Sequence, residues 1–277
     1  MITFPNAKIN IGLNIERRRS DGYHDLSTVF YPIPWKDILE IVPAKGSVTT
    51  LTVTGRKVEC PMEKNLVVKA YRALDAITPL PPVDIYLHKI IPDGAGLGGG
   101  SADAAFTLKM LNDMFATGLN SEQLVEIATR IGADCPFFIY NVPCIAYGIG
   151  EKLTPIDLNL DEYIIAVVKP PVSISTKEAF SRVVPQLPLY ALPDRIIEPI
   201  HHWNDYIKND FEASVFPAHP EIAEIKQQLL SMGASYASMS GSGTAVYGIF
   251  NDNYDTMADI LTARFPDYDI IVKEMRL

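Results

Sequence analysis

The stretch IPDGAGLGGGSADAA, residues Ile91 to Ala105, contains five glycines between positions 94 and 100. Glycine loses more backbone freedom on folding than any other residue, so this loop is costly to order. The preceding residues, VDIYLHKII, read as a strand, and the following ones, SADAAFTLKMLNDMF, read as a helix. A loop that ends at a helix N-terminus presents free backbone N–H groups and a partial positive charge. The order of elements therefore predicts an anion site, for which a polyphosphate is the usual occupant.

Other glycine motifs share letters with this loop. Gly94, Gly96 and Gly99 satisfy GxGxxG, but a dinucleotide site also needs a second strand ending in an acidic residue about 20 positions on. The sequence there, TGLNSEQLV, connects two expected helices. A P-loop needs a lysine after its last glycine, whereas Gly100 is followed by Ser101. The glycine loop of protein kinases precedes a strand. A close-packed turn between strand and helix remains as the alternative without a ligand.

Composition narrows the class of protein. The chain has 277 residues, of which 48% are hydrophobic and 21% charged, as in ordinary globular proteins. Its formal net charge of −9 argues against a nucleic-acid partner. We expect no membrane span, because no apolar run is long enough to cross a bilayer. We also expect no secretory leader, because the first residues contain neither a basic segment nor a small-residue cleavage site. Three cysteines without metal-ligand spacing indicate reduced thiols and a cytoplasmic location.

Hydrophobic periodicity predicts an α+β fold with two layers. Residues 7 to 15 alternate as an early strand, with Lys8 and Asn10 about 7 Å apart on its polar face. Residues 120 to 132 fit a helix that Asn120 or Ser121 caps and Gly132 ends. The proline-rich run from 185 to 199 reads as a surface excursion. A polar, irregular segment near residues 150–157 suggests two domains, residues 1–155 and 156–277.

Three motifs in order resemble those of the GHMP kinases, a family that includes galactokinase, homoserine kinase and mevalonate kinase. PDGAGLGGGSADAA resembles their phosphate-binding motif, PNAKINIGLNI their N-terminal strand with lysine, and SMSGSGTAVYGIF their late glycine turn. The further stretches RSDGYHDLSTVF, NLVVKAYRAL, IGADCPFF, GIGEKLTPI, KPPVSISTKEAF and NDFE fit best the branch that phosphorylates a cytidine diphosphate-linked methylerythritol for isoprenoid synthesis. Another kinase of the family, such as a homoserine kinase, is the nearest alternative.

The resemblance implies a two-domain GHMP-kinase fold with the ATP and substrate sites in a cleft between the domains. It implies ATP and Mg²⁺ as cofactors, direct phosphoryl transfer to an alcohol, Asp134 as the catalytic base, and Lys8 as its partner. The implied nucleotide site consists of Pro92, Asp93, Gly94, Ala95, Gly96, Leu97, Gly98, Gly99, Gly100, Ser101 and Ala102, with Asn65 and Lys89 near the adenosine. The implied substrate site consists of Asn10, Tyr23, His24, Asp134, Thr176, Phe180 and Gly241.

Each of these roles has a plainer alternative. Ser101 and Asn65 also suit helix capping, Asp134 suits a capping turn, and Phe180 suits a core position on a helix. We expect Cys135 to be buried and unreactive, and we assign no protein carboxylate to the metal. The partner is expected to be a small molecule, and the protein a monomer or weak homodimer. A nucleotide-dependent dehydrogenase and a non-catalytic nucleotide-binding regulator are the alternatives from other classes.

Overall fold

The computed structural model describes residues 1–58, 60–252 and 255–277. It contains two compact units, each assembled from segments that are distant in the sequence. Unit 1 comprises residues 1–7, 35–93 and 98–142, and unit 2 comprises residues 8–34, 94–97 and 143–277. The sequence-based prediction was a single boundary between residues 155 and 156, whereas each of these units combines several segments. The boundary stays a prediction.

Unit 1 is built on a four-stranded sheet. Its strands, in spatial order, are β1 (Ile2–Thr3), β4 (Ile38–Pro43), β6 (Val83–Lys89) and β5 (Thr50–Gly55). The central strand β6 pairs antiparallel with β4 and parallel with β5. Side chains at alternate positions of β6, from Val83 to Lys89, are buried. This pattern puts one face of the sheet against the helices of the unit.

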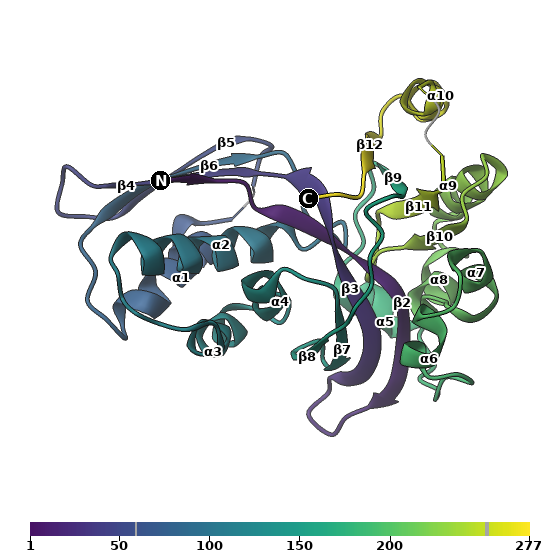
Figure 1. Cartoon of the computed structure of the whole chain (residues 1–277), viewed down its shortest axis with the longest axis horizontal. Helices are drawn as coiled ribbons and strands as arrows, with labels where there is room; N and C mark the ends of the chain where they lie inside the picture. Colours follow the sequence, from purple (N-terminus) through teal and green to yellow (C-terminus); the bar gives the residue numbers. More distant parts are fainter. Residues whose placement is uncertain (59, 253–254) are drawn as a thin grey trace. The chain divides into compact units, whose positions relative to one another are not determined.

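The helices of unit 1 lie on one side of that sheet, below β4, β5 and β6 in Figure 1. They are α1 (Leu66–Asp75), α2 (Gly99–Met114), α3 (Ser121–Ile131) and α4 (Cys135–Tyr140), with a short 3₁₀ turn, η1 (Met62–Lys64). Helix α2 packs against the other three and against β4. The expected limits of α3 are confirmed, because Asn120 and Gln123 form a capping box and the helix ends at Gly132.

Most of a second sheet lies in unit 2. Its strands, in spatial order, are β2 (Asn6–Arg18), β3 (His24–Lys36), β7 (Cys144–Gly148) and β8 (Lys152–Pro155). The early strand predicted over residues 7–15 is confirmed and extends further at its C-terminal end. Both faces of β2 are covered from Asn6 to Leu13, so its polar residues Lys8 and Asn10 are buried together with the isoleucines.

The third sheet is antiparallel throughout and lies wholly in unit 2. Its strands, in spatial order, are β10 (Tyr236–Met239), β11 (Val246–Phe250), β9 (Ile164–Lys169) and β12 (Asp269–Glu274). The helical segments of the unit are α5 (Thr176–Ser181), α6 (Leu192–Ile196), η2 (Ile200–His202), α7 (Trp203–Tyr206), α8 (Asp210–Val215), α9 (Pro220–Ser231) and α10 (Met257–Arg264). Apolar side chains of β9, β11, α8 and α9 form its core. The proline-rich run exposes Leu187 and Leu189 as expected, but its short helix α6 buries Leu192 and Ile196.

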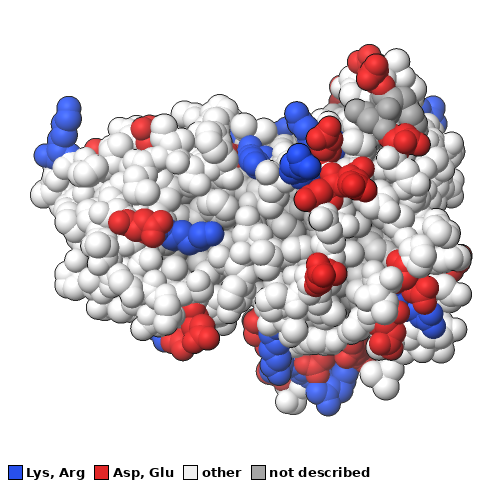
Figure 2. Space-filling view, in the orientation of Figure 1, with Lys and Arg blue, Asp and Glu red and all other residues white. Residues whose placement is uncertain are grey.

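Charged side chains are dispersed over the face drawn in Figure 2. Acidic and basic groups both occur there, in several places next to each other, and large parts of that face carry neither. Within the described ranges, no helix has both the length and the apolar character needed to cross a membrane. The expectation that nucleic acid is not a partner stays a prediction.

Candidate active site

The glycine loop alternates between two backbone conformations. Gly94, Gly96 and Gly98 have φ angles of 61°, 75° and 71°, in the left-handed region that side chains other than glycine rarely adopt. Between them, the side chains of Ala95 and Leu97 are buried. Helix α2 then begins at Gly99, and its N-cap residue Gly98 has no side chain with which to cap it. In unit 1, the first turn of α2 has backbone N–H groups that lack acceptors within the helix, and such groups commonly bind anions. Phosphate binding by the loop stays a prediction.

The part of the loop that belongs to unit 2 is locked to the late glycine turn, residues Ser240 to Thr244. The Ser240 hydroxyl donates a hydrogen bond to the Gly96 carbonyl at 2.8 Å, and Ala245 N donates to the Ala95 carbonyl at 3.2 Å. A Cβ on Gly96 would lie 1.9 Å from the Ser240 carbonyl oxygen. The late turn therefore packs directly against the glycine loop within unit 2. Gly96 is therefore required for packing.

Lys8 and Asn10 lie beside this junction, on β2. Lys8 Nζ donates to Asn10 Oδ1 at 2.7 Å, and Asn10 Nδ2 donates to Thr28 Oγ1 at 3.0 Å. Asn10 N also donates to Ser240 Oγ at 3.2 Å, and Lys8 N donates to the Leu97 carbonyl at 2.9 Å. The Lys8 ammonium lies 4.8 Å from the centre of the Phe30 ring. The strand thus holds the lysine in one buried position within reach of the glycine loop.

Gly241 lies against the same network, since a Cβ on it would be 3.3 Å from Asn10 Oδ1. The structure therefore brings four predicted site residues of unit 2 together: Lys8, Asn10, Gly96 and Gly241. Neither Thr28 nor the Ser240 hydroxyl was predicted from the sequence as a site group. No local pattern connects Ser240 with Asn10, because the two residues are 230 positions apart in the chain. The serine-rich composition of SMSGSG is the only local signal for Ser240.

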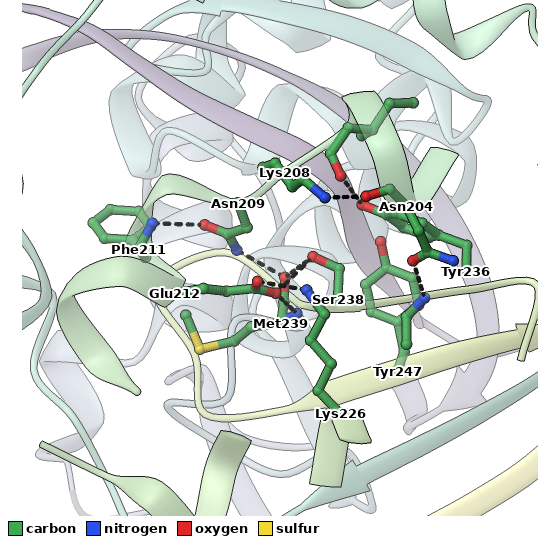
Figure 3. Close-up of polar contacts among 12 residues, drawn as sticks. Asn204, Lys208, Asn209, Phe211, Glu212, Lys226, Tyr236, Ser238, Met239 and Tyr247 are labelled. Carbon is green, nitrogen blue, oxygen red and sulfur yellow. Dashed lines mark hydrogen bonds and ion pairs between the residues drawn. The ribbon is translucent and has the colours of Figure 1, made fainter. Parts of the chain in front are cut away.

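Side chains of α8 and the preceding residues hold the late turn in place, as Figure 3 shows. Asn209 Nδ2 donates to the carbonyls of Met239 and Gly241 at 2.8 and 2.9 Å. Glu212 Oε1 accepts from Met239 N at 2.9 Å, and its other oxygen pairs with Lys226 at 2.6 Å. Asp210, in the NDFE stretch, accepts a hydrogen bond from the backbone N–H of Ile15 in β2, and burial raises its pKa. The NDFE stretch is therefore a support for the glycine turn.

In unit 1, Asp134 occupies the N-cap position of α4. Its side chain makes no capping hydrogen bond, so the simple capping alternative is not supported. The next residue, Cys135, is fully buried, and burial raises the pKa of its thiol to about 12, which confirms the expected packing role. The Ser101 hydroxyl of α2 lies close to that thiol, because a Cβ on Gly132 would be 3.2 Å from Cys135 Sγ and 3.9 Å from Ser101 Oγ. The turn that carries Asp134 therefore adjoins the first turn of the helix that follows the glycine loop.

The two residues expected near the adenosine have other partners. Asn65 is the N-cap of α1, where its side chain accepts a hydrogen bond from Val67 N at 3.0 Å. Lys89 is buried, and its ammonium group binds the carboxylates of Asp37 and Asp103. The start of α1 does lie near the nucleotide loop, because a Cβ on Gly100 would be 3.7 Å from Leu66 Cδ1. Nucleotide contacts by Asn65 and Lys89 stay predictions.

The residues expected to recognise the cytosine lie in unit 2. The rings of His24 and Phe180 are stacked, with centroids 4.6 Å apart and planes 14° from parallel. The edge of Phe211 packs against Phe180. Burial and the charge of Arg18 lower the pKa of His24, so its ring is predominantly neutral at pH 7. Tyr23 is 60% exposed at the turn between β2 and β3. Thr176 is exposed as the first residue of α5, the helix that carries Phe180.

Among the described residues, no group of three His, Cys, Asp or Glu side chains could hold a metal ion. Glu122 and Glu126 are exposed on α3.

Comparisons with known proteins agree with the sequence motifs. The model of the GHMP kinases N terminal domain matches residues 65–142, and that of the GHMP kinases C terminal domain matches residues 192–267. A protein of Bacteroides fragilis named 4-diphosphocytidyl-2-C-methyl-D-erythritol kinase is 54% identical over 253 residues, 91% of this chain and 92% of its own. A protein of Parabacteroides distasonis with the same name is 52% identical over 90% of this chain and 92% of its own.

Solved structures show the same fold. A crystal structure of 4-(cytidine 5'-diphospho)-2C-methyl-D-erythritol kinase matches with a TM-score of 0.79 and 32% identity, over 98% of both chains. The mevalonate kinase of Methanococcus jannaschii, at 13% identity, shares the fold with a TM-score of 0.74, over 100% of this chain and 98% of its own. The predicted α+β GHMP-kinase fold is confirmed. The two matched domains and the similarity to named kinases over at least 90% of the chain establish that this protein belongs to the GHMP kinase family.

Proposed function

We propose that this protein transfers the γ-phosphoryl group of ATP to the 2-hydroxyl of 4-diphosphocytidyl-2-C-methyl-D-erythritol, in the non-mevalonate route to isoprenoid precursors. One observation carries the proposal: relatives that are 52–54% identical, over at least 90% of this chain, bear the name of that kinase. The homoserine kinase of Cytophaga hutchinsonii shares the fold at 16% identity, which does not favour homoserine as the substrate.

The glycine loop is proposed to bind the triphosphate. Its left-handed glycines and the first turn of α2 offer backbone N–H groups to phosphate oxygens without an intervening Cβ. The hydroxyl of Ser101, in that first turn, is the side chain that would hold phosphate or Mg²⁺. Bound Mg²⁺ supplies neutralisation of the charge on the transferring phosphoryl group. The left-handed glycines and the helix start at Gly99 support the choice of a nucleoside triphosphate as the ligand of the loop.

Asp134 is proposed to accept the proton of the substrate hydroxyl. The hydroxyl oxygen forms a bond to the γ-phosphorus, the bond from that phosphorus to the β–γ bridging oxygen breaks, and ADP leaves. No phosphoenzyme forms, because the transfer is direct. Lys8 is proposed to keep Asp134 ionised and to orient the hydroxyl, with Asn10 fixing the position of the ammonium group at 2.7 Å. A base of this kind contributes about 10²–10⁴-fold to the rate.

Aromatic residues of unit 2 are proposed to bind the cytosine. His24 stacks on Phe180 in the structure, so the face of this ring already accepts a flat partner. Tyr23 is exposed on the neighbouring turn and is available to cover the other side of a base. Thr176 and Asn10 are proposed as further substrate contacts. Stacking of a base on an aromatic side chain contributes about 1–3 kcal/mol, so we expect these rings to select the cytidyl group.

The cytoplasmic location, the monomeric or weakly dimeric state, and the placement of both binding sites in an interdomain cleft stay predictions. If the protein were instead a nucleotide-dependent dehydrogenase, it would bind NADH. A regulator without activity would bind ATP and release no ADP. Release of ADP that depends on an alcohol acceptor would reject both alternatives.

The test is inhibition by CDP during ADP release, with 4-diphosphocytidyl-2-C-methyl-D-erythritol and homoserine compared as acceptors. We expect turnover of the cytidyl substrate alone, and CDP should compete with that substrate and not with ATP. Tyr23→Ala and Phe180→Ala should raise the KM of the cytidyl substrate by about one to two decades and leave the KM of ATP unchanged. Turnover of homoserine, or no inhibition by CDP, would reject the substrate assignment.

A further inference from the structure

Three charged side chains are buried together in unit 1. Lys89 is 5% exposed, Asp103 is 2% exposed, and Asp37 is fully buried. Lys89 Nζ donates to Asp103 Oδ2 at 2.7 Å and also to Asp37 Oδ2. We call these three residues the ion cluster. The three groups carry a net charge of −1 when all are ionised, which is an expensive arrangement to bury.

Each member of the ion cluster belongs to a different segment. Lys89 ends β6, at the position that continues the buried face formed by Val83, Ile85 and Leu87. Asp37 stands between β3 and β4, and Asp103 lies in the second turn of α2. The cluster therefore links two strand ends to the helix that follows the glycine loop.

The cluster also holds the entry to the glycine loop. The second oxygen of Asp37, Oδ1, accepts hydrogen bonds from the backbone N–H groups of Ile90 and Ile91, the latter at 2.8 Å. These are the first two residues after β6. Since Asp37 Oδ2 binds Lys89, one carboxylate fixes both the lysine and the backbone that leads into the loop.

The exit of the loop packs on the same group. A Cβ on Gly99 would lie 3.4 Å from Lys89 Nζ and 2.9 Å from Ile91 Cγ2. The first residue of α2 thus lies so close to the lysine and to the loop entry that a side chain there would crowd both. Asp103, one turn further along the helix, is bound by the same ammonium group. Entry and exit are therefore held by a single set of buried contacts.

Stability alone is a poor explanation of the ion cluster. Buried ion sets of this kind are often replaced by apolar residues of similar volume with no loss of stability. Among the described residues, Asp103 Oδ1 is buried without a hydrogen-bond partner, so the cluster is not fully satisfied. A charged cluster differs from an apolar one because its hydrogen bonds are directional. They fix the angle and the distance at which the segments meet.

We propose that Asp37, Lys89 and Asp103 are positioning residues that hold the two ends of the glycine loop so that its N–H groups match the phosphates of ATP. The proposal rests on the proposed function, since it takes ATP as the ligand of the loop. Lys89 thereby acts on the nucleotide through the backbone of the loop. Its side chain is engaged by two carboxylates.

Asp103→Asn is the most informative variant, because it preserves size and one acceptor for Lys89 but removes a charge. We expect the Kd of ATP to rise about tenfold, because a neutral amide oxygen accepts a weaker hydrogen bond from Lys89 than a carboxylate does. The KM of the alcohol substrate should stay unchanged. Hydrogen–deuterium exchange of residues 92–100, measured without nucleotide, should become faster. Lys89→Gln is measured in the same way if Asp103→Asn does not fold.

Asn112→Ala is the matched control at the opposite end of α2. Asn112 accepts from Leu119 N at 3.0 Å and donates to the Leu119 carbonyl at 3.2 Å, so its loss should lower the Tm without affecting the loop. A purely structural ion cluster would behave like this control. A lower Tm for Asp103→Asn with unchanged ATP affinity and unchanged exchange at residues 92–100 would overturn the proposal.

The exchange measurement separates this proposal from the proposed function. Faster exchange at residues 92–100 in Asp103→Asn supports positioning of the loop by the ion cluster even if the wild-type protein fails to use the cytidyl substrate. Conversely, a wild-type protein that turns over that substrate, together with an Asp103→Asn variant of unchanged loop exchange and ATP affinity, leaves the kinase function intact and rejects the positioning role.

Discussion

The glycine loop is anchored in two chemically different ways in the two units. In unit 1, the loop ends are held by buried charges, the carboxylates of Asp37 and Asp103 on either side of Lys89. In unit 2, the middle of the loop is held by uncharged groups, the Ser240 hydroxyl and the backbone around Gly96. The charged anchor depends on protonation, whereas the neutral anchor depends on steric fit. Substitutions in the neutral anchor should therefore change stability through steric fit, whereas substitutions in the charged anchor should change how stability depends on pH.

Gly96→Ala should break the neutral anchor and have the largest effect. Its Cβ would fall 1.9 Å from the Ser240 carbonyl oxygen, and φ at this position is +75°. We expect the free energy of unfolding to fall by about 3 kcal/mol, as for severe overpacking, which lowers the Tm by about 6–12 °C. Loss of ATP affinity from a substitution at Gly96 therefore includes damage to the fold.

Gly100→Ala is the control for that experiment. A Cβ there would meet only Leu66 Cδ1, at the ordinary contact distance of 3.7 Å. Within helix α2, alanine should leave the free energy of unfolding unchanged or raise it by up to about 1 kcal/mol. Thermal melting of the two variants side by side tests the comparison. Equal destabilisation by both would contradict the distinction between packed and open glycines in one loop.

Ser240→Ala should weaken the neutral anchor without a steric clash. The Gly96 carbonyl loses its donor and Asn10 N loses its acceptor, and both groups are at least partly buried. We expect a loss of about 2 kcal/mol in the free energy of unfolding, because unsatisfied buried polar groups are costly. Denaturant unfolding measures the change. A variant as stable as the wild type would show that the hydroxyl is not an anchor.

The charged anchor should make stability depend on pH. Burial raises the pKa of Asp103 from 3.8 to about 7, although the charge of Lys89 opposes the shift and that of Asp37 adds to it. Between these two pH values, the folded protein retains a proton that the unfolded chain has released. The contribution of Asp103 to the free energy of unfolding is therefore greatest below pH 4 and decreases as pH rises toward 7.

The comparison of wild type with Asp103→Asn isolates this contribution, because asparagine does not titrate. The stability of the wild type relative to the variant should decrease steadily from about pH 4 to about pH 7 and then level off. Ser240→Ala, which alters only the neutral anchor, should keep the pH dependence of the wild type. An unchanged difference between wild type and Asp103→Asn across this range would show that Asp103 is ionised throughout.

The sequence predicted the elements whose signals are local. The strand, glycine loop and helix around residues 83–114 follow from hydrophobic periodicity and composition, and the limits of α3 follow from its capping residues. The family was predicted correctly from its motifs, and the same motifs led to the prediction of Asp134 and Lys8 as site residues. Alternation along residues 7–15 was interpreted as one apolar and one polar face, but it could not reveal that both faces of β2 are covered.

The rest could not be predicted because it depends on residues that are far apart in the chain. Lys89 and Asp37 are separated by 52 positions, and no local pattern connects them. The bond between Ser240 and Gly96 spans 144 positions. Only the fold shows that Gly96 serves packing against a distant turn, whereas Gly94 has open space around it. The number of glycines in a loop does not show which of them leave space for a ligand and which pack against a distant part of the backbone.

The central claim is that Asp134 accepts the proton during phosphoryl transfer to the cytidyl substrate. The most direct test is the rate of ADP release by Asp134→Asn, with Asp113→Asn as a control for removal of an acidic charge elsewhere in unit 1. We predict a rate lower by about 10²-fold or more for Asp134→Asn, unchanged ATP affinity, and wild-type behaviour of Asp113→Asn. Turnover by Asp134→Asn close to that of the wild type would contradict the account.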